Sequence, residues 1–252
     1  MKPKLPRAPF YAAILFLSAI SPAAHASDGE GWNWMIAPYG WFVGIETDLT
    51  LPNFPPGGEP SDVDYPDILR DIDGAFQIHF EGQGDDFGMF ADFTLLGLSD
   101  ERDFDRFHTE SDMDTRLFEA AGVWSPGDER GKGIEVFAGL RYIDLDTTFA
   151  MIPTNPAFAT KTYDNGTSYS DFMLGVRYTF DISERFGVTL RGDGSVGQTE
   201  GTWNMSAVAD YKMKSGAWFF GYRYMTGELG LDDGRSMDVT LDGPMLGYGF
   251  IF

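Results

Sequence analysis

The sequence has no cysteine, few histidines and few basic residues, and these shortages narrow the class of protein. Without cysteine, the 252-residue chain has neither a disulfide framework nor a cysteine for lipid attachment. Asp and Glu number 39 against 18 Lys and Arg, which gives a formal net charge of −21. Because binding to a phosphate backbone needs a basic surface, nucleic acid is not an expected partner.

Long hydrophobic runs are also lacking, since no stretch after residue 26 is apolar and long enough for a membrane helix. What the chain has instead is 22 Phe, 11 Tyr, 6 Trp and 31 Gly. An aromatic, glycine-rich chain of modest hydropathy is typical of a membrane β-barrel, in which only alternate residues of each strand face lipid.

The N-terminus has the three parts of a secretory signal peptide. The basic residues are Lys2, Lys4 and Arg7, the apolar stretch is 10–20, and the small-x-small cleavage site is Ala24-His25-Ala26. We therefore expect residues 1–26 to be removed and residues 27–252 to form one outer-membrane β-barrel domain. In that domain 39 acidic residues remain against 15 basic ones, a net charge of −24.

The last strand ends in alternating large apolar residues. They are Leu246, Tyr248, Phe250 and Phe252. Alternation places these four on one face and Gly247 and Gly249 on the other. A lipid-facing strand favours such a face, whereas a chain end in water seldom carries one. This ending resembles the C-terminal signal of Gram-negative outer-membrane β-barrels, so we expect this strand to close the barrel.

Period-two patterns predict ten strands, which together make an all-β, antiparallel, up-and-down transmembrane β-barrel. The predicted strands are 32–43, 75–81, 87–98, 115–124, 134–148, 169–180, 187–197, 203–213, 217–227 and 239–252. Eight or twelve strands result if one is split or merged. The long connections are predicted at 44–74, 99–114, 149–168 and 228–238. Short connections alternate with them, which indicates turns and both termini at the periplasm and loops outside.

Charged residues fall on the strand faces opposite the apolar ones, which predicts a charge network in the lumen. These residues are Glu81, Asp92, Glu119, Glu135, Arg141, Asp171, Arg177, Arg191, Asp193, Asp210, Lys212 and Arg223. An Arg or Lys on the lipid face at the bilayer midplane would cost about 2–4 kcal/mol. The alternative, a soluble barrel with its apolar face inside, would have to fit all the large aromatic residues into its interior.

Several segments resemble a widespread, uncharacterised family of proteobacterial outer-membrane β-barrel proteins. The matching segments are Trp34, Pro38-Tyr39-x-Trp41, Asp64-Tyr65-x-Asp67-Ile68-Leu69, Phe80-Glu81 and Phe90-x-Asp92-x-x-x-Leu96-x-Leu98-Ser99-Asp100. The resemblance covers about the first third of the mature chain and the last strand. It implies a fold and a location, and it supplies no activity. Residues 66–71 form either a short helix at the outer mouth or an ordinary surface turn.

Candidate catalytic and metal-binding residues are sparse. His79 shares a predicted inner face with Glu81, and His108 lies in the acidic segment 100–114 together with Asp105 and Ser111. Omptin-type surface proteases use Asp-His and Asp-Asp pairs at the outer rim, so His108 is the residue to test for hydrolysis. No phosphate loop or metal motif is present, and we expect no cofactor. Loose binding of Ca²⁺ or Mg²⁺ remains an option at acidic outer residues, which include Asp62, Asp64, Asp67, Asp71, Asp73, Asp232 and Asp233.

These observations favour a cell-outer-membrane protein with a structural or surface-interaction role and no enzymatic site. The alternative is a narrow, cation-preferring channel for small solutes, because acidic residues outnumber basic ones in the predicted lumen. An outer-rim hydrolase of omptin type comes third. The expected partners are outer-membrane lipid and lipopolysaccharide, the barrel-assembly machinery and periplasmic chaperones.

Overall fold

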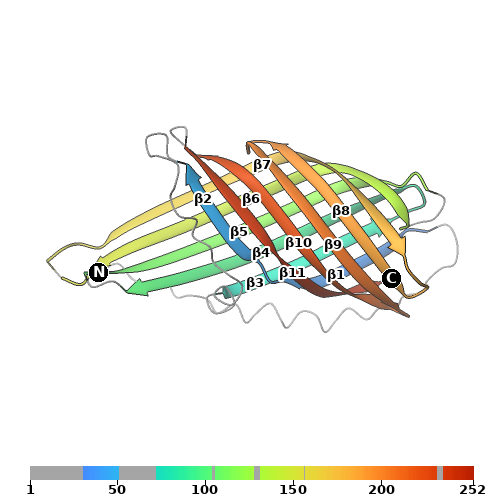
Figure 1. The fold of residues 1–252 in the computed structure, drawn as a ribbon, viewed down its shortest axis with the longest axis horizontal. Coiled ribbons are helices and arrows are strands. Elements are labelled where there is room, and N and C mark those ends of the chain that lie inside the picture. Colours follow the sequence, from blue (N-terminus) through green and yellow to red (C-terminus); the bar gives the residue numbers. More distant parts are fainter. Residues whose placement is uncertain (1–30, 51–71, 104–105, 128–130, 156, 232–234) are drawn as a thin grey trace.

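The computed structural model describes residues 31–50, 72–103, 106–127, 131–155, 157–231 and 235–252. It is built from antiparallel strands that wrap into a closed barrel (Figure 1). The strands are β1 (Asn33–Trp41), β2 (Gly44–Thr50), β3 (Ile72–Gln83), β4 (Phe87–Asp103), β5 (Phe107–Trp124), β6 (Gly133–Pro153), β7 (Lys161–Asp181), β8 (Phe186–Gly197), β9 (Gly201–Met213), β10 (Gly216–Leu231) and β11 (Arg235–Ile251). Within the described ranges, no helix has the length and apolar character needed to cross a membrane.

The barrel closes where β1 pairs with β11, from Met35↔Ile251 to Trp41↔Met245. The short β2 continues along the same partner, from Gly44↔Asp242 onward, so β1 and β2 are two pieces of one strand. The remaining strands pair in sequence order. The wall is therefore ten-stranded, antiparallel and up-and-down, which confirms the fold prediction.

The outer half of the joint between β1 and β3 is held by a side chain in place of a strand ladder. The described pairing of these strands ends at Pro38↔Ile78, and proline has no N–H to donate. Beyond it, the side-chain oxygen of Gln77 accepts a hydrogen bond from the Trp41 N–H, and Gln77 Nε2 donates to the Trp41 carbonyl at 3.5 Å. The amide thus satisfies the Trp41 backbone groups on the side of β3, where no described ladder continues.

The predicted long connections 99–114, 149–168 and 228–238 are wrong, because most of their residues extend the strands. Of the predicted 44–74 connection, residues 51–71 lie outside the described residues. β2 occupies the start of the predicted 44–74 connection, and β4 and β5 pair through most of 99–114. In the same way β6 and β7 extend into 149–168, and β10 and β11 into 228–238. The polar composition suggested loops, but polar residues also suit an antiparallel sheet that stands in water. The predicted 66–71 piece and residues 1–26 lie outside the described residues, so the signal peptide stays a prediction.

β4 to β7 project beyond the rest of the barrel as a four-stranded sheet, at the left in Figure 1. β6 and β7 have 21 residues each, whereas a tilted strand needs about 9–11 residues to cross a bilayer. The short turns and the C-terminus lie at the opposite end. We call the projecting end the outer end and the other the periplasmic end, as in barrels whose short turns face the periplasm.

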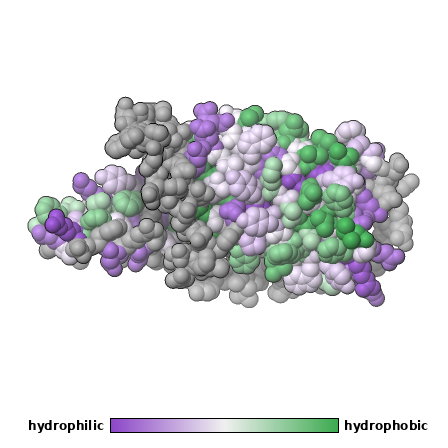
Figure 2. All heavy atoms as spheres, in the orientation of Figure 1, coloured by the Kyte–Doolittle hydropathy of each residue, from purple (hydrophilic) through white to green (hydrophobic). Residues whose placement is uncertain are grey.

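The outer wall of the barrel carries an exposed apolar belt. Large hydrophobic residues on it are Phe118, Leu140, Phe172, Leu174, Val176, Leu190, Met205, Phe220 and Leu246, and rings near the periplasmic end are Phe87, Trp124, Trp218 and Phe250. Figure 2 shows hydrophobic residues gathered over the tilted strands, with hydrophilic residues toward both ends. Only a membrane solvates a belt of this kind, so the chain is an integral outer-membrane barrel.

In the last strand, large side chains on the outer face alternate with glycines on the inner face. Leu246, Phe250 and Phe252 are 42–48% exposed on the outer wall. Gly247 faces inward, where an added Cβ would lie 2.4 Å from the Phe219 ring and 2.5 Å from the Tyr39 Cβ. The ends of the wall are joined by two backbone hydrogen bonds between Phe252 and Trp34, at 2.9 and 3.0 Å.

Candidate functional site: the barrel lumen

The lumen is crossed at mid-height by a layer of ion pairs, which we call the charge layer. Its centre is Glu119 on β5, which is fully buried. Arg141 Nε donates to Glu119 Oε1 at 2.8 Å, and Arg223 Nη2 lies 3.1 Å from the same oxygen. Arg191 Nη2 donates to the other oxygen, Oε2, at 3.2 Å. Three guanidinium groups from three strands therefore surround one carboxylate.

Asp193 on β8 is the second carboxylate of this centre. Arg191 Nε donates to Asp193 Oδ2 at 2.7 Å, and Arg141 also pairs with Asp193. Asn204 Nδ2 donates to Asp193 Oδ2 at 2.7 Å and its oxygen accepts from Arg223 Nε at 2.8 Å. The amide thus links one ion pair to the next, which satisfies atoms that burial would otherwise make costly.

The periplasmic side of the charge layer is built around Arg177, which pairs with Glu81 and Glu135. Gln83 Nε2 and Ser125 Oγ also donate to Glu135 Oε1, at 2.7 and 2.8 Å. Glu135 is only 1% exposed, so these polar contacts replace the water that it has lost.

His79 connects the two groups of ion pairs. Its Nε2 lies 3.2 Å from Glu81 Oε2 and its Nδ1 lies 3.1 Å from Asp92 Oδ2. The Tyr39 hydroxyl donates to Asp92 Oδ1 at 2.8 Å, and Arg223 Nη1 lies 3.9 Å from the same atom. A continuous set of side chains therefore runs from Arg177 to Glu119 across the lumen.

Of the twelve charged residues predicted to form the lumen network, the structure brings nine into the charge layer. They are Glu81, Asp92, Glu119, Glu135, Arg141, Arg177, Arg191, Asp193 and Arg223. The rings of Phe90 and Phe137 lie about the Arg191 guanidinium, with centroids at 5.0 and 4.9 Å, and Arg223 lies 4.9 Å from the Trp41 ring centroid. These distances are those of cation–π interactions, which add to the stabilisation of the two guanidinium groups.

Asp171, Asp210 and Lys212 are exceptions to that prediction. Asp171 accepts hydrogen bonds from the Ser195 hydroxyl at 2.9 Å and from the backbone N–H groups of Gln198 and Thr199 at 2.9 and 3.1 Å, so it caps the β8–β9 turn. The Oδ2 atom of Asp210 has no hydrogen bond among the described residues.

Lys212 belongs to the periplasmic rim and not to the charge layer. Its Nζ lies 3.0 Å from Asp181 Oδ1, and Lys132 Nζ lies 3.0 Å from Asp181 Oδ2. Hydrogen bonds from Lys132 and Lys212 hold the pKa of Asp181 below its ordinary value. This rim cluster stands in water, so its attractions are screened.

Above the charge layer the lumen is apolar, which the sequence reasoning missed. We call this part the apolar chamber. Its buried residues are Trp41, Val43, Ile45, Leu96, Leu117, Ile143, Leu145, Tyr169, Met225, Leu229, Val239 and Met245. The signal was present in the strand alternation, since Ile143 and Leu145 have the same parity as Arg141. Following only charged residues along each inner face hid the change.

The outward face of the projecting sheet is acidic. Its exposed or half-exposed acids are Glu101, Asp103, Glu110, Asp112, Asp114, Asp144, Asp146 and Asp164. Two pairs of like charge stand directly opposite each other, Glu101↔Glu110 and Asp114↔Asp146. At the base of the sheet Arg116 Nη1 donates to Asp144 at 2.6 Å, which raises the pKa of the guanidinium.

His108, the residue singled out for hydrolysis, lies near the tip of this sheet. Its Nδ1 is 2.8 Å from the exposed Asp103 and its Nε2 is 3.8 Å from Glu110. Both partners come from the same β4–β5 hairpin. Asp105 lies outside the described residues, and in the described part of the chain no group of three or more acids or histidines is placed to hold a metal ion.

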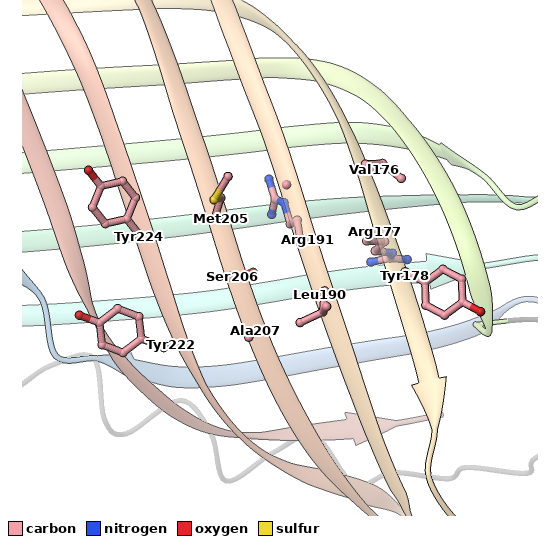
Figure 3. Close-up of a pocket in the computed structure, with 11 residues that line it drawn as sticks. Val176, Arg177, Tyr178, Leu190, Arg191, Met205, Ser206, Ala207, Tyr222 and Tyr224 are labelled. Carbon is pink, nitrogen blue, oxygen red and sulfur yellow. The ribbon is translucent and has the colours of Figure 1, made fainter.

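The lipid-facing wall has a groove of about 510 Å³ over β7 to β10, shown in Figure 3. Gly192 and Ala207 form its floor, and Leu190, Met205 and Tyr224 stand around it. It lies within the apolar belt on the outer wall, so it belongs to the lipid-facing surface and not to the lumen.

Comparison with known proteins gives a general likeness only. No family model and no curated relative matches the chain. Among solved structures, the outer membrane protease OmpT from Escherichia coli has a TM-score of 0.47 and 10% identity, covering 90% of this chain and 99% of its own. Ail, the attachment invasion locus protein of Yersinia pestis, solved with the heparin analogue sucrose octasulfate, has a TM-score of 0.41 and 11% identity, covering 89% of this chain and 100% of its own. Neisserial surface protein A has a TM-score of 0.30 and 12% identity, covering 88% and 99%. At these scores the likeness gives no ground for assigning the activities of those proteins to this chain.

Proposed function

We propose that this chain is a non-enzymatic outer-membrane barrel with a closed lumen, which acts through its projecting outer sheet. The observation that carries the proposal is the charge layer. Arg141, Glu119 and Glu135 are at most 1% exposed. Charged side chains as deeply buried as these have little contact with water, which supports a closed lumen over the alternative of a cation-preferring channel.

The projecting sheet supplies the interaction surface. Its outward acidic face suits a basic partner, because complementary charge speeds encounter and orients the partner. Among the described strands, residues 161–169 of β7 pair only with β6, since pairing with β8 starts at Asp171↔Gly197. A free edge next to an acidic face suits an extended basic segment that adds a strand to the sheet.

The other partners in the proposal follow from location. Lipopolysaccharide and outer-membrane lipid contact the belt, and Ca²⁺ or Mg²⁺ associate loosely with the acidic outer strands without a dedicated site. The barrel-assembly machinery and periplasmic chaperones would handle the chain before insertion, with Phe250 and Phe252 in the closing strand as their signal.

Single-channel recording in planar bilayers tests the closed lumen. We expect purified protein to give no discrete conductance steps. The double variant Arg141→Ala, Glu119→Ala removes the central ion pair and also takes the shared carboxylate from Arg191 and Arg223, and it serves as a positive control that opens the layer. Regular steps with cation preference in the unmodified protein would overturn the closed barrel in favour of the channel.

Two further assays test the remaining parts of the proposal. Peptide and lipid hydrolysis by the purified protein should be absent, and activity that disappears in His108→Ala would establish the outer-rim hydrolase instead.

A labelled oligolysine peptide should bind in a salt-dependent way and bind several-fold more weakly to the double variant Asp112→Asn, Asp114→Asn. Glu184→Gln, in an exposed turn at the periplasmic end, is the matched control and should not change binding.

A further inference from the structure

The edge of the projecting sheet along β7 is long and regular (Figure 1). Residues 161–169 pair with β6 in an unbroken register, from Met151↔Lys161 to Ile143↔Tyr169. This described pairing contains no bulge, and this part of β7 contains no proline. Bulges and prolines are devices that keep a further strand away from an exposed edge. The β7 edge is therefore a template for strand addition.

The direction of the backbone groups along this edge follows from Ser170. Its N–H donates to Gln198 Oε1 at 2.7 Å, and its carbonyl accepts from the Gln198 N–H at 3.3 Å. Both backbone groups of Ser170 thus point away from β6. Because this direction alternates along an antiparallel strand, the even-numbered residues 162–168 also point their N–H and C=O groups away from β6. No described strand pairs with them there, since the pairing with β8 starts only at Asp171↔Gly197.

The two faces of the sheet beside this edge differ in polarity. On the outward face, Asp164 is exposed on β7 itself, and Asp144 and Asp146 lie on the neighbouring β6. On the inward face, the exposed Tyr163 stands opposite the half-buried Phe149. Side chains of any strand that joins the sheet alternate between these faces. Such a strand would meet carboxylates with every second residue and aromatic rings with the residues between them.

A second copy of this chain suits the edge less well. Two β7 edges joined antiparallel would bring Asp164 of one copy toward the acidic face of the other, and like charges across a strand pair are destabilising. The formal net charge of −21 adds repulsion between whole molecules. A basic partner is attracted instead, so charge complementarity selects a different chain.

We infer that the β7 edge binds an extended segment in which basic and apolar residues alternate, antiparallel to β7. Its basic side chains lie on the outward face beside Asp164, and its apolar side chains lie on the inward face beside Tyr163. Its backbone pairs with the even-numbered residues 162–168. This inference rests on the proposed surface interaction, and it narrows the partner from any basic segment to an amphipathic strand.

Two labelled octapeptides test the alternation, with the purified protein in nanodiscs of zwitterionic lipid and empty nanodiscs as the control for partition into lipid. One peptide alternates lysine and valine, and the other has four lysines followed by four valines. We expect the alternating peptide to bind about tenfold more tightly in fluorescence anisotropy, because only it places every lysine on the acidic face. Equal binding of the two octapeptides, with oligolysine still bound, would overturn this inference and leave the proposed function intact. Failure of all three peptides to bind would overturn both.

N-methylated peptides test whether the backbone of the partner takes part. The lysines would lie opposite even-numbered residues of β7, so their N–H groups face the edge, whereas the valine N–H groups face away from it. N-methylation of two lysines should therefore weaken binding about tenfold, and N-methylation of two valines by at most about twofold. Equal losses from the two modifications would overturn strand addition.

A tyrosine variant of the protein tests the inward face. Tyr163→Ser removes the exposed ring from β7, so it should weaken the alternating peptide about two- to fivefold and leave oligolysine binding unchanged. Asp164→Asn is the complementary variant and should weaken the binding of both peptides. Unchanged binding of the alternating peptide to Tyr163→Ser would overturn the assignment of the apolar side chains to the inward face.

A single introduced cysteine distinguishes this partner from a second copy, because the chain has no cysteine of its own. Thr162 is exposed on the β7 edge, and Glu184 is exposed in a turn at the periplasmic end. We expect both Thr162→Cys and Glu184→Cys to stay monomeric in the nanodisc samples under mild oxidation. Disulfide-linked dimers of Thr162→Cys, without dimers of Glu184→Cys, would overturn the choice of partner in favour of a second copy.

Discussion

The membrane-spanning and projecting parts of β5 and β6 have opposite polarity on the same faces. Within the membrane, β6 turns Leu140 outward and Arg141 inward; four residues further on, Asp144 points outward and Leu145 inward. The inward and outward alternation of the side chains continues unchanged along the strand. What changes is the solvent at its outer face, from lipid to water. Lipid requires an apolar outer face, whereas water requires a polar one and a buried apolar interior. The polarity change therefore marks the outer boundary of the membrane near Arg116 and Asp144.

The buried charges of the membrane-spanning part should contribute far more to stability than the exposed charges of the projecting part. Glu119→Ala would leave Arg141, Arg191 and Arg223 close together and buried without their shared carboxylate. We expect the free energy of unfolding to fall by about 3–5 kcal/mol, measured by urea unfolding in phospholipid vesicles. Glu110→Ala on the projecting sheet is the control and should change it by at most about 0.5 kcal/mol. Similar losses in both variants would contradict a buried charge layer.

A charge introduced on the outer face tests where the membrane boundary lies along a strand. Leu174 is 56% exposed on the lipid-facing wall of β7, and Thr162 is exposed on the projecting part of the same strand. Leu174→Arg should destabilise the folded barrel by about 2–4 kcal/mol, because the guanidinium would lie in hydrocarbon. Thr162→Arg should be nearly neutral, because water solvates it. If both changes were neutral in the same vesicle assay, the membrane boundary would have to be moved.

The sequence predicted the membrane-spanning part well and the projecting part poorly, for a physical reason. In the membrane-spanning part, large apolar residues on one strand face alternate regularly with charged residues on the other, and this pattern identified the ten-stranded wall and the inward direction of Glu119 and Arg141. The projecting strands are polar on one face and mixed on the other, which looks like a loop in one dimension. The partners of Asp171 could not be predicted either. The N–H groups that donate hydrogen bonds to it belong to a turn whose position depends on the register of β7 and β8.

Carboxylates that stand opposite each other on the projecting sheet should slightly lower its stability. Asp114 stands opposite Asp146, and like charges in that position are destabilising. Asp114→Asn should therefore stabilise the sheet by about 0.2–1 kcal/mol at low salt, and less at high salt. Asp164→Asn is the control because its opposite residue is Thr148, and it should give no gain. Hydrogen exchange of the β5–β6 amides measures the difference, and a loss of protection in Asp114→Asn would contradict this account.

The smallest effect is expected at the periplasmic rim, where the charges are paired as in the lumen but stand in water. Lys132 and Lys212 hold the pKa of Asp181 below its ordinary value. A carboxyl whose folded pKa is depressed adds stability above its unfolded pKa of about 3.9 and loses it as pH falls through the folded pKa. Stability of the wild type should therefore decline more steeply with acidification below about pH 5 than that of Asp181→Asn, which has no carboxyl to protonate. Unfolding midpoints measured from pH 6 downward would show the two curves converging in acid, and parallel curves would mean that solvent screening cancels the attraction of the lysines.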